Sequence, residues 1–166
     1  MTKARRRFEV RQIQPRDFHW LKDFDCAPLT IERDSIYLFF CVHFRDTSFV
    51  AYDSESQRAV GFVLGFVPAG SSHAYVHYLF VEESIRKHGI GRALMGQFCD
   101  AAHNLGATTT CLYTIRESKF YQGLGFTHHC GPFDTSLARY VADVKGAHLM
   151  TATLPLSSPP VRYLCP

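Results

Sequence analysis

Residues 81–94, VEESIRKHGIGRAL, carry the most informative pattern in this 166-residue chain. They begin where residues 73–81, a segment rich in aromatic and β-branched side chains, come to an end. A polar loop and a glycine-bearing turn follow, and then apolar residues recur at helical spacing from Ile90 onward. The pattern predicts a strand, a loop and an amphipathic helix in succession, with Gly106 ending the helix.

The predicted start of this helix is suited to binding an anion. The first backbone N–H groups of a helix have no partners within it, and the helix dipole adds partial positive charge, so phosphate binds well there. Gly89 and Gly91 have no side chain to block the approach of a diphosphate. Arg86, Lys87 and Arg92 add positive charge around the turn.

Two common phosphate-binding motifs fail here on specific residues. A Walker A loop requires a Lys-Ser/Thr pair after its second glycine, where this chain has Arg92 and Ala93. A dinucleotide-binding fingerprint requires a small residue three places after Gly91, and Leu94 occupies that position. The pattern that remains is R-x-x-G-x-G-x-A, formed by Arg86, Gly89, Gly91 and Ala93.

This pattern resembles the coenzyme A loop of the GNAT (GCN5-related N-acetyltransferase) family, Gln/Arg-x-x-Gly-x-Gly/Ala. Residues 120–126, FYQGLGF, are similar to a second family signature, in which a tyrosine precedes a Leu-Gly-Phe turn. One predicted helix and one predicted strand separate the two motifs, as in the family. The resemblance covers about residues 60–133 and implies an N-acetyltransferase that uses acetyl-CoA; a purely structural turn is the alternative for the first motif alone.

The order of the predicted elements agrees with the fold that this resemblance implies. That fold is α/β, with a mixed, mostly antiparallel sheet of about six to seven strands, a central parallel pair and flanking helices. Strands are predicted at 8–14, 47–52, 59–67, 73–81, 108–115, 126–133 and 147–154, and helices at 15–24, up to about 40, 90–105 and 117–124. A right-handed crossover should make strands 73–81 and 108–115 parallel.

The expected domain organisation is simple. A basic, flexible N-terminus at 1–7 precedes one N-acetyltransferase domain at 8–154, and a Pro-rich tail follows at 155–166.

The resemblance also implies which residues hold the cosubstrate. In the family, the strand before the loop diverges from its neighbour and pairs its free backbone groups with the pantetheine arm, although an ordinary core strand is the alternative. The loop amides then hold the diphosphate. Thr114 stands where family members often carry a cofactor-contacting asparagine. The implied cofactor-binding residues are Leu79, Phe80, Val81, Arg86, Lys87, His88, Gly89, Ile90, Gly91, Arg92, Ala93 and Thr114.

Two residues are catalytic candidates. Tyr121 matches the family tyrosine near the thioester sulfur, which implies a general acid for the leaving thiolate, and a tyrosine pKa of about 10 suits that role. His77 stands where arylalkylamine-type members place a catalytic histidine, and a pKa of about 6.5 suits a base. Strand alternation puts Tyr75 on the same face. Packing roles are the alternatives for both candidates, and Glu82 and Glu83 are fallback bases.

No metal is expected. His128, His129 and Cys130 are adjacent, but successive residues of a strand point to opposite faces and cannot converge on one ion. No C-x-x-C or H-E-x-x-H pattern supplies other ligands.

Composition limits the classes of partner. The net charge is +3, with 46% hydrophobic and 20% charged residues, which is typical of a globular protein and not of a nucleic-acid binder. No signal peptide or membrane-length apolar run is present, so no membrane partner is expected. Six cysteines without paired spacing indicate free thiols in a cytoplasmic protein. Dimers are common in the resembled family, which makes a homodimer a further expectation.

The expected acceptor is the primary amine of a small molecule: an amino acid, a diamine or an arylalkylamine. Residues 37–68 also resemble the diaminobutyrate acetyltransferases, but those enzymes tend to carry tryptophan where this chain has His77. Two alternatives stay open. One is a protein or peptide N-acetyltransferase, for which an acidic acceptor groove is expected. The other is a non-catalytic module that binds coenzyme A.

Overall fold

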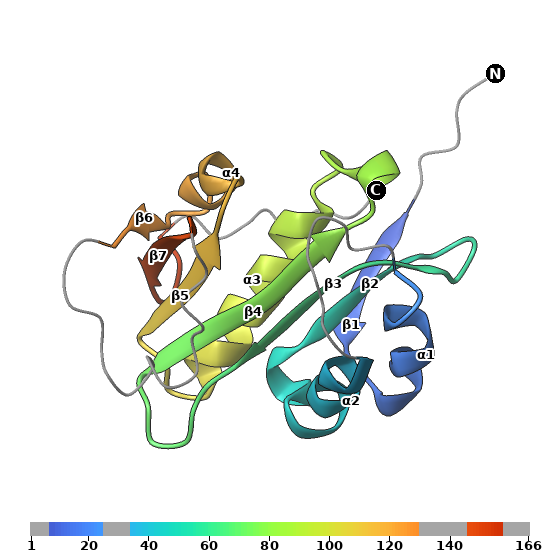
Figure 1. Ribbon diagram of the computed structural model, residues 1–166, viewed down its shortest axis with the longest axis horizontal. Helices are drawn as coiled ribbons and strands as arrows, with labels where there is room; N and C mark the ends of the chain where they lie inside the picture. The colour runs from blue at the N-terminus through green and yellow to red at the C-terminus, as the bar shows by residue number, and fades with distance from the viewer. Residues whose placement is uncertain (1–6, 25–33, 130–145, 158–166) are drawn as a thin grey trace.

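The computed structural model describes residues 7–24, 34–129 and 146–157 (Figure 1). Seven strands form one sheet in the order β1-β2-β3-β4-β5-β7-β6. The strands are β1 (Phe8–Gln12), β2 (Phe49–Asp53), β3 (Ala59–Phe66), β4 (His73–Val81), β5 (Thr109–Thr114), β6 (Thr127–His128) and β7 (His148–Thr153). The helices are α1 (Phe18–Leu21), α2 (Asp34–His43), α3 (Ile90–Asn104) and α4 (Ser118–Gln122), with short 3-10 turns η1 (Pro15–Asp17), η2 (Arg45–Thr47) and η3 (Glu83–Ile85).

The strand directions confirm the predicted fold class. Neighbouring strands are antiparallel except β4 and β5, which are parallel and are joined through α3. In Figure 1, α3 lies behind the sheet, whereas α1 and α2 lie in front of it. The sheet therefore has one core layer on each face.

The α3 layer follows from the periodicity of its sequence. Its buried side chains recur at helical spacing and face the sheet; they are Ile90, Leu94, Met95, Phe98, Cys99 and Ala102. Phe98 packs so closely on β3 that a Cβ atom at Gly65 would lie 2.3 Å from Cε2 of the ring. Glycine at this position lets the long helix approach the centre of the sheet.

The opposite layer is largely aromatic. Phe62, Leu64 and Phe66 alternate along β3 and pack against α1 and α2, where Leu21, Tyr37 and Phe40 are buried. In η1, just before α1, the buried carboxylate of Asp17 accepts hydrogen bonds from the Arg11 guanidinium, the Tyr52 hydroxyl and the Gln14 N–H. These bonds fix η1, and thus the start of α1, against β1 and β2.

Several helices and strands begin or end at residues other than those predicted from the sequence. Thr47, predicted to begin a strand, belongs instead to η2, so β2 begins at Phe49, and α2 continues past Phe40 to His43. Of the strand predicted at 126–133, the described part contains only β6, and residues 130–133 lie outside the described residues. Residues 1–6 and 158–166 also lie outside them, so the predicted terminal segments stay predictions.

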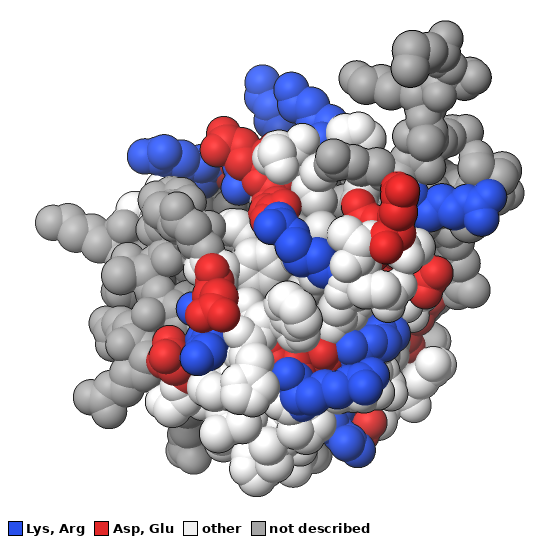
Figure 2. Space-filling view, turned by 90° about the vertical axis from the view of Figure 1, so that its right-hand side faces the viewer, with Lys and Arg blue, Asp and Glu red and all other residues white. Residues whose placement is uncertain are grey.

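The surface carries charges of both signs. Figure 2 shows that acidic and basic side chains are interspersed on the face at the right of Figure 1. In the part of the chain that is described, no helix has the length and apolarity needed to cross a membrane.

Candidate functional site

The site begins where two parallel strands separate. β4 and β5 are paired only from His73 to Tyr75, opposite Thr109 to Cys111. Beyond that point β5 continues to pair with β7 as far as Thr114, while residues 76–81 of β4 have no partner on β5. Figure 1 shows the two strands diverging toward the end of the sheet that carries η3 and α4. Within the described residues, the β5-facing edge of residues 76–81 therefore pairs with no strand, as the family resemblance implied.

A β-bulge lies at the point of divergence. Val76 pairs with Gly65 and Tyr78 pairs with Leu64, which leaves His77 as the extra residue on β4. A bulge bends its strand and redirects side chains, and bulges are frequent beside active sites. The ring centroid of His77 lies 5.9 Å from that of Tyr75 and 4.2 Å from that of Tyr78. Tyr75 and His77 thus share a face as predicted, but Tyr78 joins them because the bulge breaks the alternation.

The loop after β4 presents unpaired backbone donors. Ile85 is buried and anchors η3 to the core, whereas Arg86, Lys87 and His88 are exposed. The N–H groups of residues 87–92 donate to no described residue, and no side chain caps α3. Lys87 and Gly89 have positive φ angles of 67° and 84°. A non-glycine residue in this region is strained, and such strain concentrates at functional sites.

Two side chains of this loop have backbone partners. The Arg86 Nε–H donates to the carbonyl of Val81 at 2.9 Å. His88 Nδ1 lies 3.0 Å from the carbonyl oxygens of both Ile85 and Arg86. The Val81 carbonyl, implied as a pantetheine contact, thus already accepts a hydrogen bond from the Arg86 side chain. The N–H groups of residues 87–92 have no such partner among the described residues.

Tyr121 lies on α4, across the divergence from the loop. The residue is buried, and its ring contacts those of Phe120 and Phe126, with centroids 5.0 and 5.8 Å away. Burial, reinforced by the charge of Glu117, raises the pKa of the Tyr121 hydroxyl above its ordinary value. Thr114 is also buried, and its Oγ1 accepts the N–H of Glu117 at 3.2 Å, which orients the start of α4.

His77 is half-buried among aromatic side chains. Its ring stacks on Phe40 of α2, and no described residue hydrogen-bonds its buried Nδ1. Burial lowers the pKa of His77 to about 4, so the imidazole is neutral at pH 7. Of the fallback bases, Glu82 forms an ion pair with Arg58 and Glu83 is exposed.

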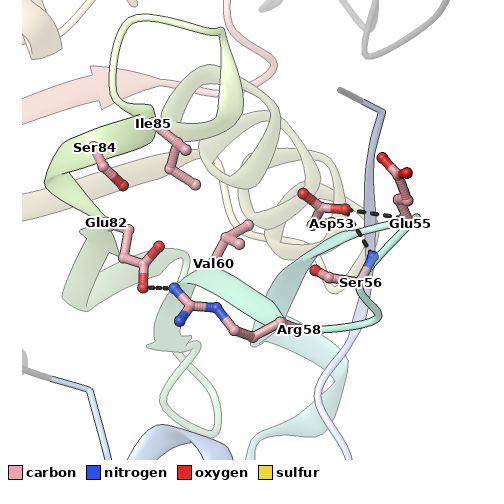
Figure 3. A pocket seen from close by; sticks show the side chains of 8 residues that line it. All are labelled: Asp53, Glu55, Ser56, Arg58, Val60, Glu82, Ser84 and Ile85. Carbon is pink, nitrogen blue, oxygen red and sulfur yellow. Dashed lines mark hydrogen bonds and ion pairs between the residues drawn. The ribbon is translucent and has the colours of Figure 1, made fainter. Parts of the chain in front are cut away.

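A separate hollow lies beside the loop (Figure 3). Its volume is about 520 Å³, and it lies between the β2–β3 hairpin and η3. The residues that line it are Asp53, Glu55, Ser56, Arg58, Val60, Glu82, Ser84 and Ile85. Neither His77 nor Tyr121 is among them, whereas both partners of the Arg58–Glu82 ion pair are. The hollow is therefore separate from the two candidate catalytic residues.

The adjacent histidines form no metal cluster within the described residues. His128 lies on β6, and its ring contacts that of His148 on β7, with centroids 5.5 Å apart. No group of three or more His, Cys, Asp or Glu side chains in residues 7–24, 34–129 and 146–157 is arranged to hold a metal ion. Cys130 lies outside these ranges.

Comparison with known proteins identifies similar chains. Residues 45–128 match the family profile described as an acetyltransferase (GNAT) domain. Among curated proteins the chain has no significant match. A similar solved structure is Ard1 from Thermoplasma volcanium, with 20% identity, a TM-score of 0.70, and 88% of this chain and 97% of that chain covered.

Two further similar structures differ in what they bind. One is diaminobutyrate acetyltransferase EctA from Paenibacillus lautus, in complex with L-2,4-diaminobutyric acid and coenzyme A; identity is 18%, the TM-score 0.69, and coverage 89% of this chain and 95% of that chain. The other is the NatC complex bound to Gag peptide and CoA, with 20% identity, a TM-score of 0.71, and coverage of 89% and 99%. At these identities the likeness shows the fold.

Proposed function

The chain belongs to the GNAT family of acetyltransferases, and we propose that it transfers acetyl from acetyl-CoA to the primary amine of a small molecule by direct attack. It is an N-acetyltransferase, and acetyl-CoA is its cosubstrate. The observation that carries the proposal is the free edge of β4 next to the unpaired N–H groups of residues 87–92. This arrangement offers an extended backbone for the pantetheine arm and an anion site for the diphosphate at one end of it.

In the proposed reaction the amine nitrogen attacks the thioester carbonyl carbon. A C–N bond forms, the C–S bond breaks, and the sulfur leaves as a thiolate. Tyr121 supplies the proton that converts the thiolate to a thiol, and water then reprotonates the tyrosine. Because burial raises its pKa, Tyr121 keeps its proton at neutral pH until the thiolate forms.

His77 is proposed to receive the proton that the attacking amine loses, either directly or through a water molecule. Its lowered pKa makes it a weak base, but the imidazole is neutral and its Nδ1 has no described partner. A neutral imidazole can accept a hydrogen bond from an amine and can relay its proton to water.

The side chains around His77 support a small acceptor with an apolar body. Phe40 stacks on His77, and Tyr75 and Tyr78 contact it from β4. The ring contacts recorded for His77 are thus all with aromatic side chains. Burial of an apolar acceptor body against aromatic rings is favourable. This favours an arylalkylamine over a diamine.

A peptide acceptor is the second candidate. One chain of the NatC complex has a similar fold, and that complex is bound to a peptide, whereas the similar EctA is bound to a small amino acid. A non-catalytic module that only binds coenzyme A is the third.

One assay separates these candidates. The purified chain is incubated with acetyl-CoA and a panel of arylalkylamines, diamines, amino acids and N-terminal peptides, and free thiol release is measured together with coenzyme A binding by calorimetry. We expect binding and the highest kcat/KM with an arylalkylamine. Turnover with peptides alone would show that the acceptor is a peptide and not a small-molecule amine. Coenzyme A binding without turnover on any acceptor would favour the non-catalytic module.

A further inference from the structure

Arg92 connects the proposed diphosphate site to the turn that carries Tyr121. It lies in the first turn of α3, and its Nη1 donates to the carbonyl of Gly123, at the C-terminal cap of α4, at 3.1 Å. A Cβ atom at Gly123 would lie 3.0 Å from the other terminal nitrogen, Nη2. The guanidinium thus lies directly against the end of α4.

A second contact joins the same two elements. A Cβ atom at Gly91 would lie 3.1 Å from Cζ of Phe120, so the Phe120 ring packs on the backbone of the first turn of α3. Phe120 precedes Tyr121 in α4, and the carbonyl of Tyr121 accepts the N–H groups of Leu124 and Phe126. Backbone hydrogen bonds therefore link Tyr121 to Leu124 and Phe126, and Phe120 packs this turn against α3.

The α4 turn needs such support. Five residues are too few for a helix that is stable alone, and the last carbonyls of any helix lack partners within it. A cation at a helix C-terminus satisfies these carbonyls and interacts favourably with the dipole. Within the described residues, Arg92 is the charged side chain that hydrogen-bonds the C-terminal end of α4.

We propose that Arg92 is a positioning residue that holds Tyr121 in place through the Gly123 carbonyl. The proposal rests on the proposed function, because it assumes that Tyr121 is the acid. It differs from the expectation drawn from the sequence, in which Arg92 contributes positive charge to the diphosphate. A diphosphate ligand acts on coenzyme A affinity, whereas a positioning residue acts on turnover.

The test compares five proteins: wild type, Arg92→Gln, Arg92→Lys, Tyr121→Phe and the double variant Arg92→Gln/Tyr121→Phe. A sixth protein, Lys87→Gln, is the matched control, since it removes one positive charge near the start of α3 and no described bond joins Lys87 to α4. The readouts are kcat on the best acceptor, the coenzyme A Kd by calorimetry, and amide hydrogen exchange of peptides covering residues 117–126. Arg92 is exposed, so the variants should fold, and circular dichroism checks this.

We expect Arg92→Gln to lower kcat about tenfold while changing the Kd less than threefold, as loss of one charge-assisted hydrogen bond predicts. Arg92→Lys should recover part of the loss. The double variant should be no slower than Tyr121→Phe alone, because both changes act through the same hydroxyl. Exchange in residues 117–126 should quicken in Arg92→Gln and stay unchanged in Lys87→Gln.

Three results would overturn the assignment: a tenfold weaker Kd with unchanged kcat in Arg92→Gln, multiplicative losses in the double variant, or unchanged exchange in α4. A wild-type protein that neither binds coenzyme A nor turns over would instead refute the proposed function. In that case the exchange measurement still tests the contact between Arg92 and α4.

Discussion

The imidazole ring of His77 stacks on the phenyl ring of Phe40, with ring centroids 5.3 Å apart and planes inclined by 19°. The contact joins the bulge of β4 to the middle of α2. It covers part of the imidazole, and this burial lowers the pKa of His77 to about 4.

Burial of His77 should make stability fall at acid pH. The folded-state pKa lies below the ordinary value, so the unfolded chain binds the proton more readily, and stability is lost as the pH falls from about 6.5 toward 4. His77→Phe removes this titration. Relative to the variant, wild type should lose on the order of 2–3 kcal/mol between pH 7 and pH 4 in urea unfolding. Equal pH dependence in the two proteins would show that the imidazole is hydrated.

The role of Tyr121 predicts a loss confined to turnover. Tyr121→Phe removes the hydroxyl that protonates the thiolate and keeps the ring, so kcat should fall about 100-fold while the coenzyme A Kd stays within twofold of wild type. Tyr52→Phe is the control, because the Tyr52 hydroxyl binds Asp17 and should affect stability alone. An undiminished kcat in Tyr121→Phe would remove the assigned role.

The buried carboxylate of Asp17 should contribute more stability than any exposed ion pair. Its side chain is 1% exposed, and although burial alone would raise the pKa of Asp17, the hydrogen bonds from Arg11, Tyr52 and Gln14 outweigh it and lower the pKa. Asp17→Asn should cost about 2–3 kcal/mol at pH 7. Because the folded-state pKa is lowered, this difference should shrink as the pH falls below about 4.

The control for Asp17 is Arg58→Gln, which breaks an ion pair whose arginine side chain is 55% exposed. Such pairs contribute less than about 1 kcal/mol, so this variant should unfold near wild type in urea. A larger loss in Arg58→Gln than in Asp17→Asn would contradict the burial argument.

Replacement by alanine should destabilise the fold much more at Gly65 than at Gly91. At Gly65 the new Cβ would lie 2.3 Å from the Phe98 ring and 2.8 Å from the Tyr75 carbonyl, which is backbone and cannot move easily. Gly65→Ala should therefore cost about 3 kcal/mol. At Gly91 the nearest atom is the tip of Phe120, at 3.1 Å. Gly91→Ala should cost about 1 kcal/mol or less by thermal melt but lower kcat, because it displaces α4.

Local patterns in the sequence predict most of this fold. The bounds of β4 agree with the prediction, and those of α3 agree to within one residue, because hydrophobic periodicity and the glycine turn are encoded within those segments. The resemblance implied the divergence of β4 from β5, and the register shows it. Residues 25–33 and 130–145, which include the second half of the strand predicted at 126–133, lie outside the described part.

Contacts between distant segments could not be predicted in this way. The bulge at His77 depends on the register between β3 and β4, and the stacking on Phe40 depends on how α2 packs. The bond from Arg92 to Gly123 spans 31 residues. None of these leaves a local pattern in a single sequence, so the environment of His77 and the support of α4 are visible only in the folded chain.

The central claim is that the free N–H groups of residues 87–92 bind the diphosphate of coenzyme A, and a titration of ¹⁵N-labelled protein followed by amide resonances tests it most directly. Coenzyme A should produce its largest shifts at residues 87–92 and 79–81, whereas pantetheine, which lacks the diphosphate, should shift residues 79–81 alone. Coenzyme A titrations that leave residues 87–92 unmoved, or that shift the residues around Arg58 instead, would contradict the account.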